Sequence, residues 1–178
     1  MQILVKSTTI RIVLLIGIYF FPISIFAQET ELISFKIKDQ FGREYTEKSW
    51  GDSILVFIGS DKDGSRYSGA WGIAISDSLR KYSDQSPIKF IPNADLRGVP
   101  FFLKGYIRGK FPKEKERWTL LDWKGIFPKT YHYEKKVCNI LIFNRERKLI
   151  HIVSGHEVDQ GKLDEIVEKL KMLLKEEI

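Results

Sequence analysis

The chain has 178 residues and a formal net charge of +6, and 43% of its residues are hydrophobic. This length and composition allow the core of one ordinary domain, and the mild positive charge does not by itself indicate a partner. The single cysteine, Cys138, excludes an intrachain disulfide and any redox cycle that needs two cysteines of one chain.

The N-terminal segment 1–27 has the pattern of a secretory signal peptide. Basic residues precede an apolar run at 12–21, Pro22 interrupts the run, and a small residue ends the segment. A retained membrane anchor is the alternative, but the unbroken run is shorter than the roughly 20 residues that a spanning helix needs. We therefore predict cleavage before Gln28, export to the bacterial periplasm or the medium, and a single domain at 28–178 with a net charge of +4.

The first half of the exported part predicts a strand–loop–helix unit. Residues 32–38 alternate apolar and polar side chains, as in a half-exposed strand. Residues 54–58 are consecutive apolar residues, which predict a strand buried on both faces. A polar loop that begins at Gly59 then leads to a segment at 69–82, where apolar residues recur at the three- and four-residue spacing of an amphipathic helix.

Shorter elements are expected in the middle of the chain. Residues 88–91 predict a strand stopped by Pro92, and residues 93–100 predict a loop. Pro100 fits the first turn of a short helix that contains the aromatic and aliphatic residues up to Ile107. An exposed charged connection, a short extended piece at 119–122 and irregular chain or a single helical turn at 123–131 then follow.

The C-terminal part predicts a hairpin and a helix. Residues 139–143 and 149–153 are apolar runs joined by a polar turn, which is typical of an antiparallel pair of strands. Asp159 can cap a final amphipathic helix that runs through Glu177.

This order of elements resembles the thioredoxin fold. Leu55-Val56-Phe57 before the polar loop resembles the strand that precedes the active site of a periplasmic redoxin or peroxiredoxin-like domain, and residues 143–150 followed by Ser154-Gly155 resemble the terminal hairpin. The resemblance covers residues 32–176. It implies an α/β, thioredoxin-like fold: a central mixed β-sheet flanked by helices, with an N-terminal β extension and a C-terminal β-hairpin plus helix.

The resemblance also implies an active-site loop, but the loop lacks the residues for its chemistry. The two cysteines of a Cys-x-x-Cys site would fall on Lys62 and Ser65, and neither side chain replaces a thiolate. We therefore predict an exported thioredoxin-like protein without catalytic residues, metal or cofactor, which binds or scaffolds an envelope protein or a small ligand. Its degenerate active-site loop comprises Ser60, Asp61, Lys62, Asp63, Gly64, Ser65 and Arg66.

Cys138 supports an alternative function. By register from the hairpin it falls near the position at which thioredoxin-like proteins keep a cis-proline that faces the active-site loop. A one-cysteine thiol oxidoreductase or peroxidase-like enzyme would use Cys138, with its pKa lowered by Lys62. A small, semi-buried residue at the edge of a strand is the other interpretation.

Other site motifs fail at the residue level. The glycine spacing of the loop approaches a phosphate-binding loop, but Ser65-Arg66 stands where that motif needs Lys followed by Ser or Thr. Asp61 and Asp63 form a fragment of a calcium loop whose closing acid would fall on Ala70. The three histidines have no zinc-ligand spacing.

The sequence also limits the classes of partner that we expect. The basic and aromatic stretch 104–117 is interrupted by Glu114 and Glu116, so we expect a solvated connection and no nucleic-acid partner. An envelope partner could instead dock on Trp118, Trp123 and the aromatic run 127–133. Membrane contact is expected only through an uncleaved signal segment.

Overall fold

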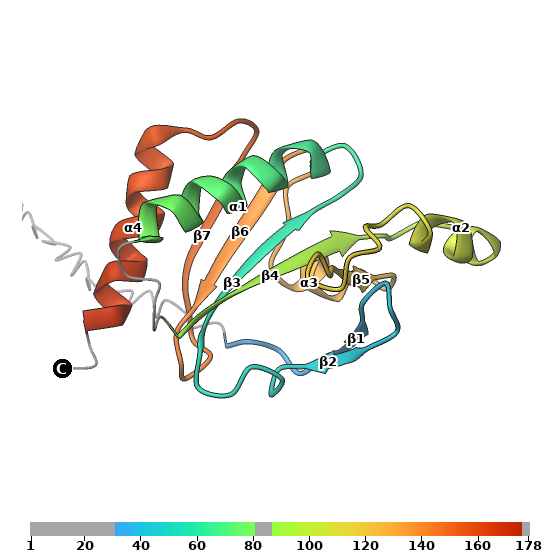
Figure 1. Cartoon of the computed structure of the whole chain (residues 1–178), viewed down its shortest axis with the longest axis horizontal. Helices are drawn as coiled ribbons and strands as arrows, with labels where there is room; N and C mark the ends of the chain where they lie inside the picture. Colours follow the sequence, from blue (N-terminus) through green and yellow to red (C-terminus); the bar gives the residue numbers. More distant parts are fainter. Residues whose placement is uncertain (1–30, 81–86, 176–178) are drawn as a thin grey trace, which may run out of the picture.

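A computed structural model describes residues 31–80 and 87–175, so the predicted signal segment lies outside the described residues. The central strand β3 (Ile54–Ser60) is the third of five in a sheet of order β5-β4-β3-β6-β7. On one side, β4 (Ile88–Asp95) and β5 (Leu120–Asp122) run parallel to β3. On the other side, β6 (Cys138–Phe143) and β7 (Leu149–Gly155) form the antiparallel hairpin (Figure 1).

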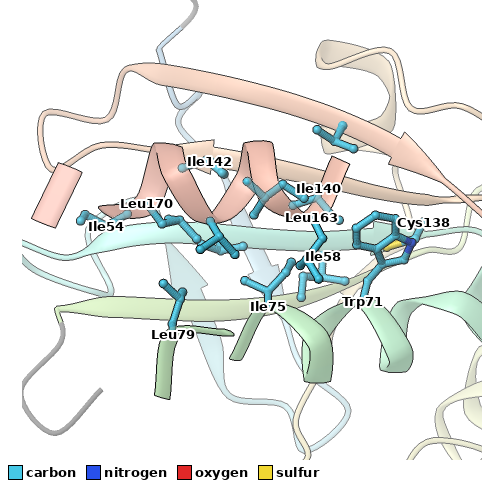
Figure 2. Packing of buried hydrophobic residues seen from close by; sticks show 14 of the residues in the cluster. Ile54, Ile58, Trp71, Ile75, Leu79, Cys138, Ile140, Ile142, Leu163 and Leu170 are labelled. Atoms are coloured by element: carbon cyan, nitrogen blue, oxygen red, sulfur yellow. The ribbon is translucent and has the colours of Figure 1, made fainter. Parts of the chain in front are cut away.

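Two long helices cover one face of this sheet. Helix α1 (Ser65–Leu79) and helix α4 (Gln160–Lys175) bury their apolar sides against alternate residues of β3 and β6. The Asp159 side chain accepts the amide hydrogen of Lys162 at 2.9 Å, as predicted for the cap of α4. Figure 2 shows this core. None of the helices within 31–80 and 87–175 is long and apolar enough to cross a membrane.

The other face carries an aromatic core. It is covered by the hairpin of β1 (Lys36–Lys38) and β2 (Glu44–Thr46) and by α3 (Ile126–Thr130). The ring centroids of Phe57 and Phe127 are 4.6 Å apart, which is typical of packed aromatic rings.

A short projection leaves the sheet between β4 and β5. It consists of the 3₁₀ turn η2 (Phe101–Leu103) and helix α2 (Lys104–Arg108), and Figure 1 shows α2 at the opposite end of the molecule from α4. The predicted mixed sheet flanked by helices, the N-terminal β extension, and the terminal hairpin plus helix are all confirmed.

Two predicted strand boundaries were wrong, in opposite directions. Pro92 does not stop β4, because β5 pairs with β4 only from Asn93 onward. A proline is therefore tolerated at a position with a neighbouring strand on one side only. In contrast, the predicted strand 32–38 is reduced to β1, because the amide of Phe35 donates to the Glu47 carboxylate at 3.2 Å rather than to a strand.

Candidate functional site

The candidate site is the junction at which β3 ends and α1 begins. Ser60 is the last residue of β3 and is buried, because its ladder to β4 continues at Ala94. Ser65 and Arg66 already belong to α1, four residues earlier than the predicted helix. The predicted loop is therefore a short turn of four residues, Asp61 to Gly64, between a buried strand and a helix.

Asp61 fixes this turn. One of its carboxylate oxygens accepts the amide hydrogen of Gly64 at 2.8 Å, and the other accepts the amide hydrogen of Lys136 at 3.0 Å. The second bond joins the turn to the segment before β6, which is the neighbour that the resemblance implied. Asp61 is thus a structural clamp between two chain segments rather than a fragment of a calcium loop.

Gly64 lies against the same segment. A Cβ atom at this position would approach the carbonyl oxygen of Val137 to 2.2 Å, which no side chain tolerates. Only glycine therefore permits this close approach of the two backbones.

Cys138, the first residue of β6, lies under α1 and is fully buried. It belongs to the same core cluster as Trp71 (Figure 2). Burial raises the pKa of the Cys138 thiol to about 11, against a smaller lowering by a hydrogen bond with Ser68. The alternative in which Lys62 lowers this pKa is contradicted, because Lys62 is exposed and burial moves the pKa of the thiol upward.

The polar groups around Cys138 give no nucleophile. The Ser68 hydroxyl donates to the Ser60 hydroxyl at 2.9 Å, so the two serines and the thiol form a short polar chain between β3, α1 and β6. A hydroxyl needs an adjacent base to become a nucleophile, and neither partner in this chain is one. Within the described residues, no three His, Cys, Asp or Glu side chains are grouped to hold a metal ion.

A second polar group, missed by the sequence analysis, lies on the other face of the sheet at the ends of its parallel strands. Asn93 and Asp122 are buried, and Asn93 pairs in register with Gly59 of β3. Tyr133 covers that glycine, where a Cβ would come within 2.2 Å of the ring. The described residues offer no hydrogen-bond partner to the Asn93 amide or to the Tyr133 hydroxyl.

Burial also shifts the acidity of this group. Desolvation raises the pKa of Asp122, although its carboxylate accepts the amide hydrogen of Phe127 at 2.9 Å. The same cause raises the pKa of Tyr133 well above its ordinary value. The signal available in the sequence was a polar residue directly after an apolar strand, at the edge where α/β proteins place their ligands.

A groove of about 680 Å³ runs beside the candidate site. One wall is α1, where the lining side chains are mostly small. The floor is the α1-facing side of β3 and β4, and the opposite wall is the segment 112–119. The groove is lined by Ile58, Ser65, Ser68, Gly69, Gly72, Ile73, Ser76, Asp77, Phe90, Pro92, Pro112, Glu116, Arg117, Trp118 and Thr119.

The aromatic run proposed for docking does not form an exposed patch. Phe127 and Tyr131 are buried in the aromatic core. Trp118 stacks on Tyr45 with ring centroids 4.8 Å apart, because the N-terminal hairpin covers this face. The most exposed aromatic side chains described are instead Phe101 and Phe102, in the projection.

No family model matches the sequence, and no curated protein matches it significantly. Solved structures do match. An uncharacterised thioredoxin-like protein from Porphyromonas gingivalis has a TM-score of 0.60 and 17% identity, over 83% of this chain and 94% of its own. The fold is thioredoxin-like.

Two further structures support this assignment of the fold. A protein from Chlorobium tepidum named as a thiol:disulfide interchange protein has a TM-score of 0.57 at 12% identity, covering 82% of this chain and 96% of its own. The exposed lipoprotein thioredoxin of Streptococcus pneumoniae has a TM-score of 0.54 at 16% identity, covering 79% and 99%. This thioredoxin-like chain has one cysteine and therefore lacks Cys-x-x-Cys.

Proposed function

We propose that this protein is a non-catalytic, thioredoxin-like binding protein of the bacterial cell envelope. The observation that carries the proposal is the state of Cys138, which is fully buried and has a pKa raised to about 11. Thiol chemistry needs an accessible thiolate, which thioredoxin-like enzymes place at the start of the helix after the central strand. In this chain, that place holds Lys62 and Ser65.

An envelope location is supported by two independent observations. Residues 1–27 have the pattern of a signal peptide. A structurally similar protein is named an exposed lipoprotein thioredoxin. Mass spectrometry of the protein isolated from cells should give an N-terminus at Gln28, and a chain that retains Met1 would contradict the predicted cleavage.

The groove beside α1 is the proposed binding surface, and its occupant is an extended segment of an envelope protein. Its apolar floor and mixed polar walls suit a peptide backbone with alternating side chains. Gly69 supports this role, because a Cβ added there would have no atom within 4 Å. Packing therefore does not require glycine, which costs a helix roughly 0.5–1 kcal/mol relative to alanine.

The absence of thiol catalysis is tested on the protein isolated from cells. Insulin reduction by a thiol donor and peroxide consumption should not exceed the uncatalysed rate. Cys138→Ser is the matched control, because it removes the sulfur and keeps the size of the side chain. Turnover that disappears in this variant would overturn the proposal and favour the one-cysteine oxidoreductase or peroxidase-like enzyme.

Binding in the groove is tested by photo-crosslinking in cells. A photoreactive residue at Ile73, which lines the groove and is 65% exposed, should give a discrete protein adduct. The same residue at Met172 on α4, 55% exposed, is the control position. Gly69→Trp should abolish the adduct by filling the groove, and Gly69→Ala should retain it.

The Gly69→Ala variant also separates an effect on binding from an effect on folding. Gly69→Ala should raise the free energy of unfolding by about 0.5–1 kcal/mol, because it removes a glycine from an exposed helix position. If the photoreactive residues at positions 73 and 172 formed the same adducts, the capture would be non-specific, and this result would contradict binding in the groove. A lack of any adduct at 73 would contradict a polypeptide partner.

A further inference from the structure

The projection between β4 and β5 exposes an unusual amount of aromatic surface. The side chains of Phe101, Phe102 and Tyr106 are 85%, 78% and 62% exposed, and Leu103 is 38% exposed. Isolated apolar side chains on a surface are ordinary, whereas several adjacent large ones mark a contact surface. We call residues 101–111 the aromatic projection.

The aromatic projection is held by the domain at its base. Directly after residue 111, the side-chain amide of Gln40 donates to the carbonyl oxygen of Pro112 at 3.4 Å, and it also donates to that of Arg117 at 2.9 Å. The ammonium group of Lys104 lies 5.3 Å from the ring centre of Trp123, which links α2 to the body of the domain. The exposed rings are therefore presented on an anchored segment.

The charge of the aromatic projection has one sign. It contains Lys104, Arg108 and Lys110 and no acidic residue. The ammonium group of Lys110 lies 4.7 Å from the ring centre of Tyr106, so cationic and aromatic groups are interleaved. This combination is typical of segments that enter the interface of an anionic membrane, where aromatic rings reach the acyl boundary and cations meet the lipid phosphates.

We propose that the aromatic projection is a peripheral membrane contact that inserts Phe101 and Phe102 into the interface of an anionic lipid bilayer. The placement of the segment carries this choice of occupant: Figure 1 shows α2 projecting at the end of the molecule opposite α4, and the rings of Phe101 and Phe102 are largely exposed there, where a flat surface can reach them. The adjacent cations supply charge complementarity to lipid phosphates. This contact would act in addition to any uncleaved signal segment and does not depend on the groove.

The test uses a local reporter, so that residues 1–27, where retained, do not determine the signal. Gly105→Cys places a thiol on exposed helix surface with no atom near its Cβ, and an environment-sensitive fluorophore is attached there. The native Cys138 is buried and should not be labelled. Met172→Cys carries the same fluorophore at an exposed position of α4, the helix that Figure 1 shows at the opposite end of the molecule from α2.

Vesicles of phosphatidylcholine with phosphatidylglycerol should shift the emission of the fluorophore at 105 to shorter wavelength and leave the one at 172 unchanged. Vesicles of phosphatidylcholine alone should bind more weakly, by roughly fivefold for each of the three cations. The double substitution Phe101→Ser and Phe102→Ser should weaken binding at least about tenfold. The double substitution Arg108→Gln and Lys110→Gln should remove most of the preference for anionic lipid.

Three results would overturn the proposal. The first is an unchanged spectrum at 105 with anionic vesicles at low salt. The second is a shift of equal size at 105 and 172. The third is a shift that survives the two Phe→Ser changes, which would show that the aromatic rings do not enter the bilayer.

Discussion

Two aromatic segments of this chain have similar compositions and opposite environments. At 127–133, Phe127 is fully buried and Tyr131 nearly so, whereas Phe101 and Phe102 in the aromatic projection are largely exposed. The difference lies in what covers each segment. The chain just before the N-terminal hairpin brings Phe35 to 5.0 Å from Phe127, ring centre to ring centre, so a segment about 90 residues earlier in the chain completes that core. An aromatic pattern in the sequence therefore does not reveal whether a segment packs into the core of its own chain or faces solvent.

The strongest test of this contrast removes one ring from each segment. Phe127→Ala should lower the free energy of unfolding by about 3–5 kcal/mol, because it empties a core aromatic site. Phe101→Ala should change it by no more than about 0.5 kcal/mol, as expected for an exposed position. Denaturant unfolding followed by circular dichroism measures both. Equal losses in the two variants would contradict the assigned environments.

Thiol reactivity sharpens the same contrast. The thiol of Gly105→Cys is exposed, whereas the pKa of Cys138 is raised to about 11. Because alkylation proceeds through the thiolate, the upward shift alone leaves Cys138 with roughly 100-fold less reactive form near neutral pH, and burial slows it further. The rate at 105 should level off above about pH 9, while the rate at Cys138 should keep rising toward pH 11.

Peptide mapping after iodoacetamide treatment measures the two rates in one protein. Wild-type protein is the control for Cys138, because its rate should not change with the substitution at 105. Comparable rates at both positions in the native protein would contradict the buried environment of Cys138 and restore the one-cysteine enzyme as a candidate.

Local patterns predicted the arrangement of the sheet well. The apolar run at 54–58 marked the central strand, and the two apolar runs around a polar turn marked the hairpin, because strand burial leaves a direct signature in consecutive side chains. The position of Cys138 beside the active-site turn also followed from register. Its chemistry did not, because the pKa of a thiol depends on the helix that covers it, here α1.

The second polar group was missed for a local reason. The sequence predicts that a strand ends at Pro92 and therefore places Asn93 in a loop, where polar side chains are common. The pairing of Asn93 with both Gly59 and Leu120 shows that it is a strand residue inside the sheet. A proline stops a strand only where its missing amide hydrogen was needed, and that depends on a neighbour that one sequence does not reveal.

Tyr131 and Tyr133, both in the segment 127–133, allow a finer comparison, between a hydroxyl group with hydrogen-bond partners and one to which the described residues offer none. The Tyr131 hydroxyl accepts the amide hydrogen of Ile33 at 3.0 Å and donates to the carbonyl of Glu31 at 3.1 Å. Tyr131→Phe should therefore cost about 1 kcal/mol. Tyr133→Phe should be neutral or stabilising by up to about 1 kcal/mol, because the described residues give its hydroxyl no partner. Thermal unfolding of the two variants measures the difference, and a larger loss for Tyr133→Phe would contradict it.

The smallest expected effect concerns the stability of the aromatic projection itself. The double substitution Phe101→Ser and Phe102→Ser should leave the free energy of unfolding within about 0.5 kcal/mol of the wild-type value, since both rings are exposed in the folded chain. Denaturant unfolding without lipid measures it, and the same variant is the one expected to lose vesicle binding. A loss above about 1 kcal/mol would mean that the rings pack against the domain, and they would then be unavailable to a membrane. Unchanged stability together with lost vesicle binding is the combination that distinguishes a contact surface from an incomplete core, because a core residue cannot lose its ring without destabilising the fold.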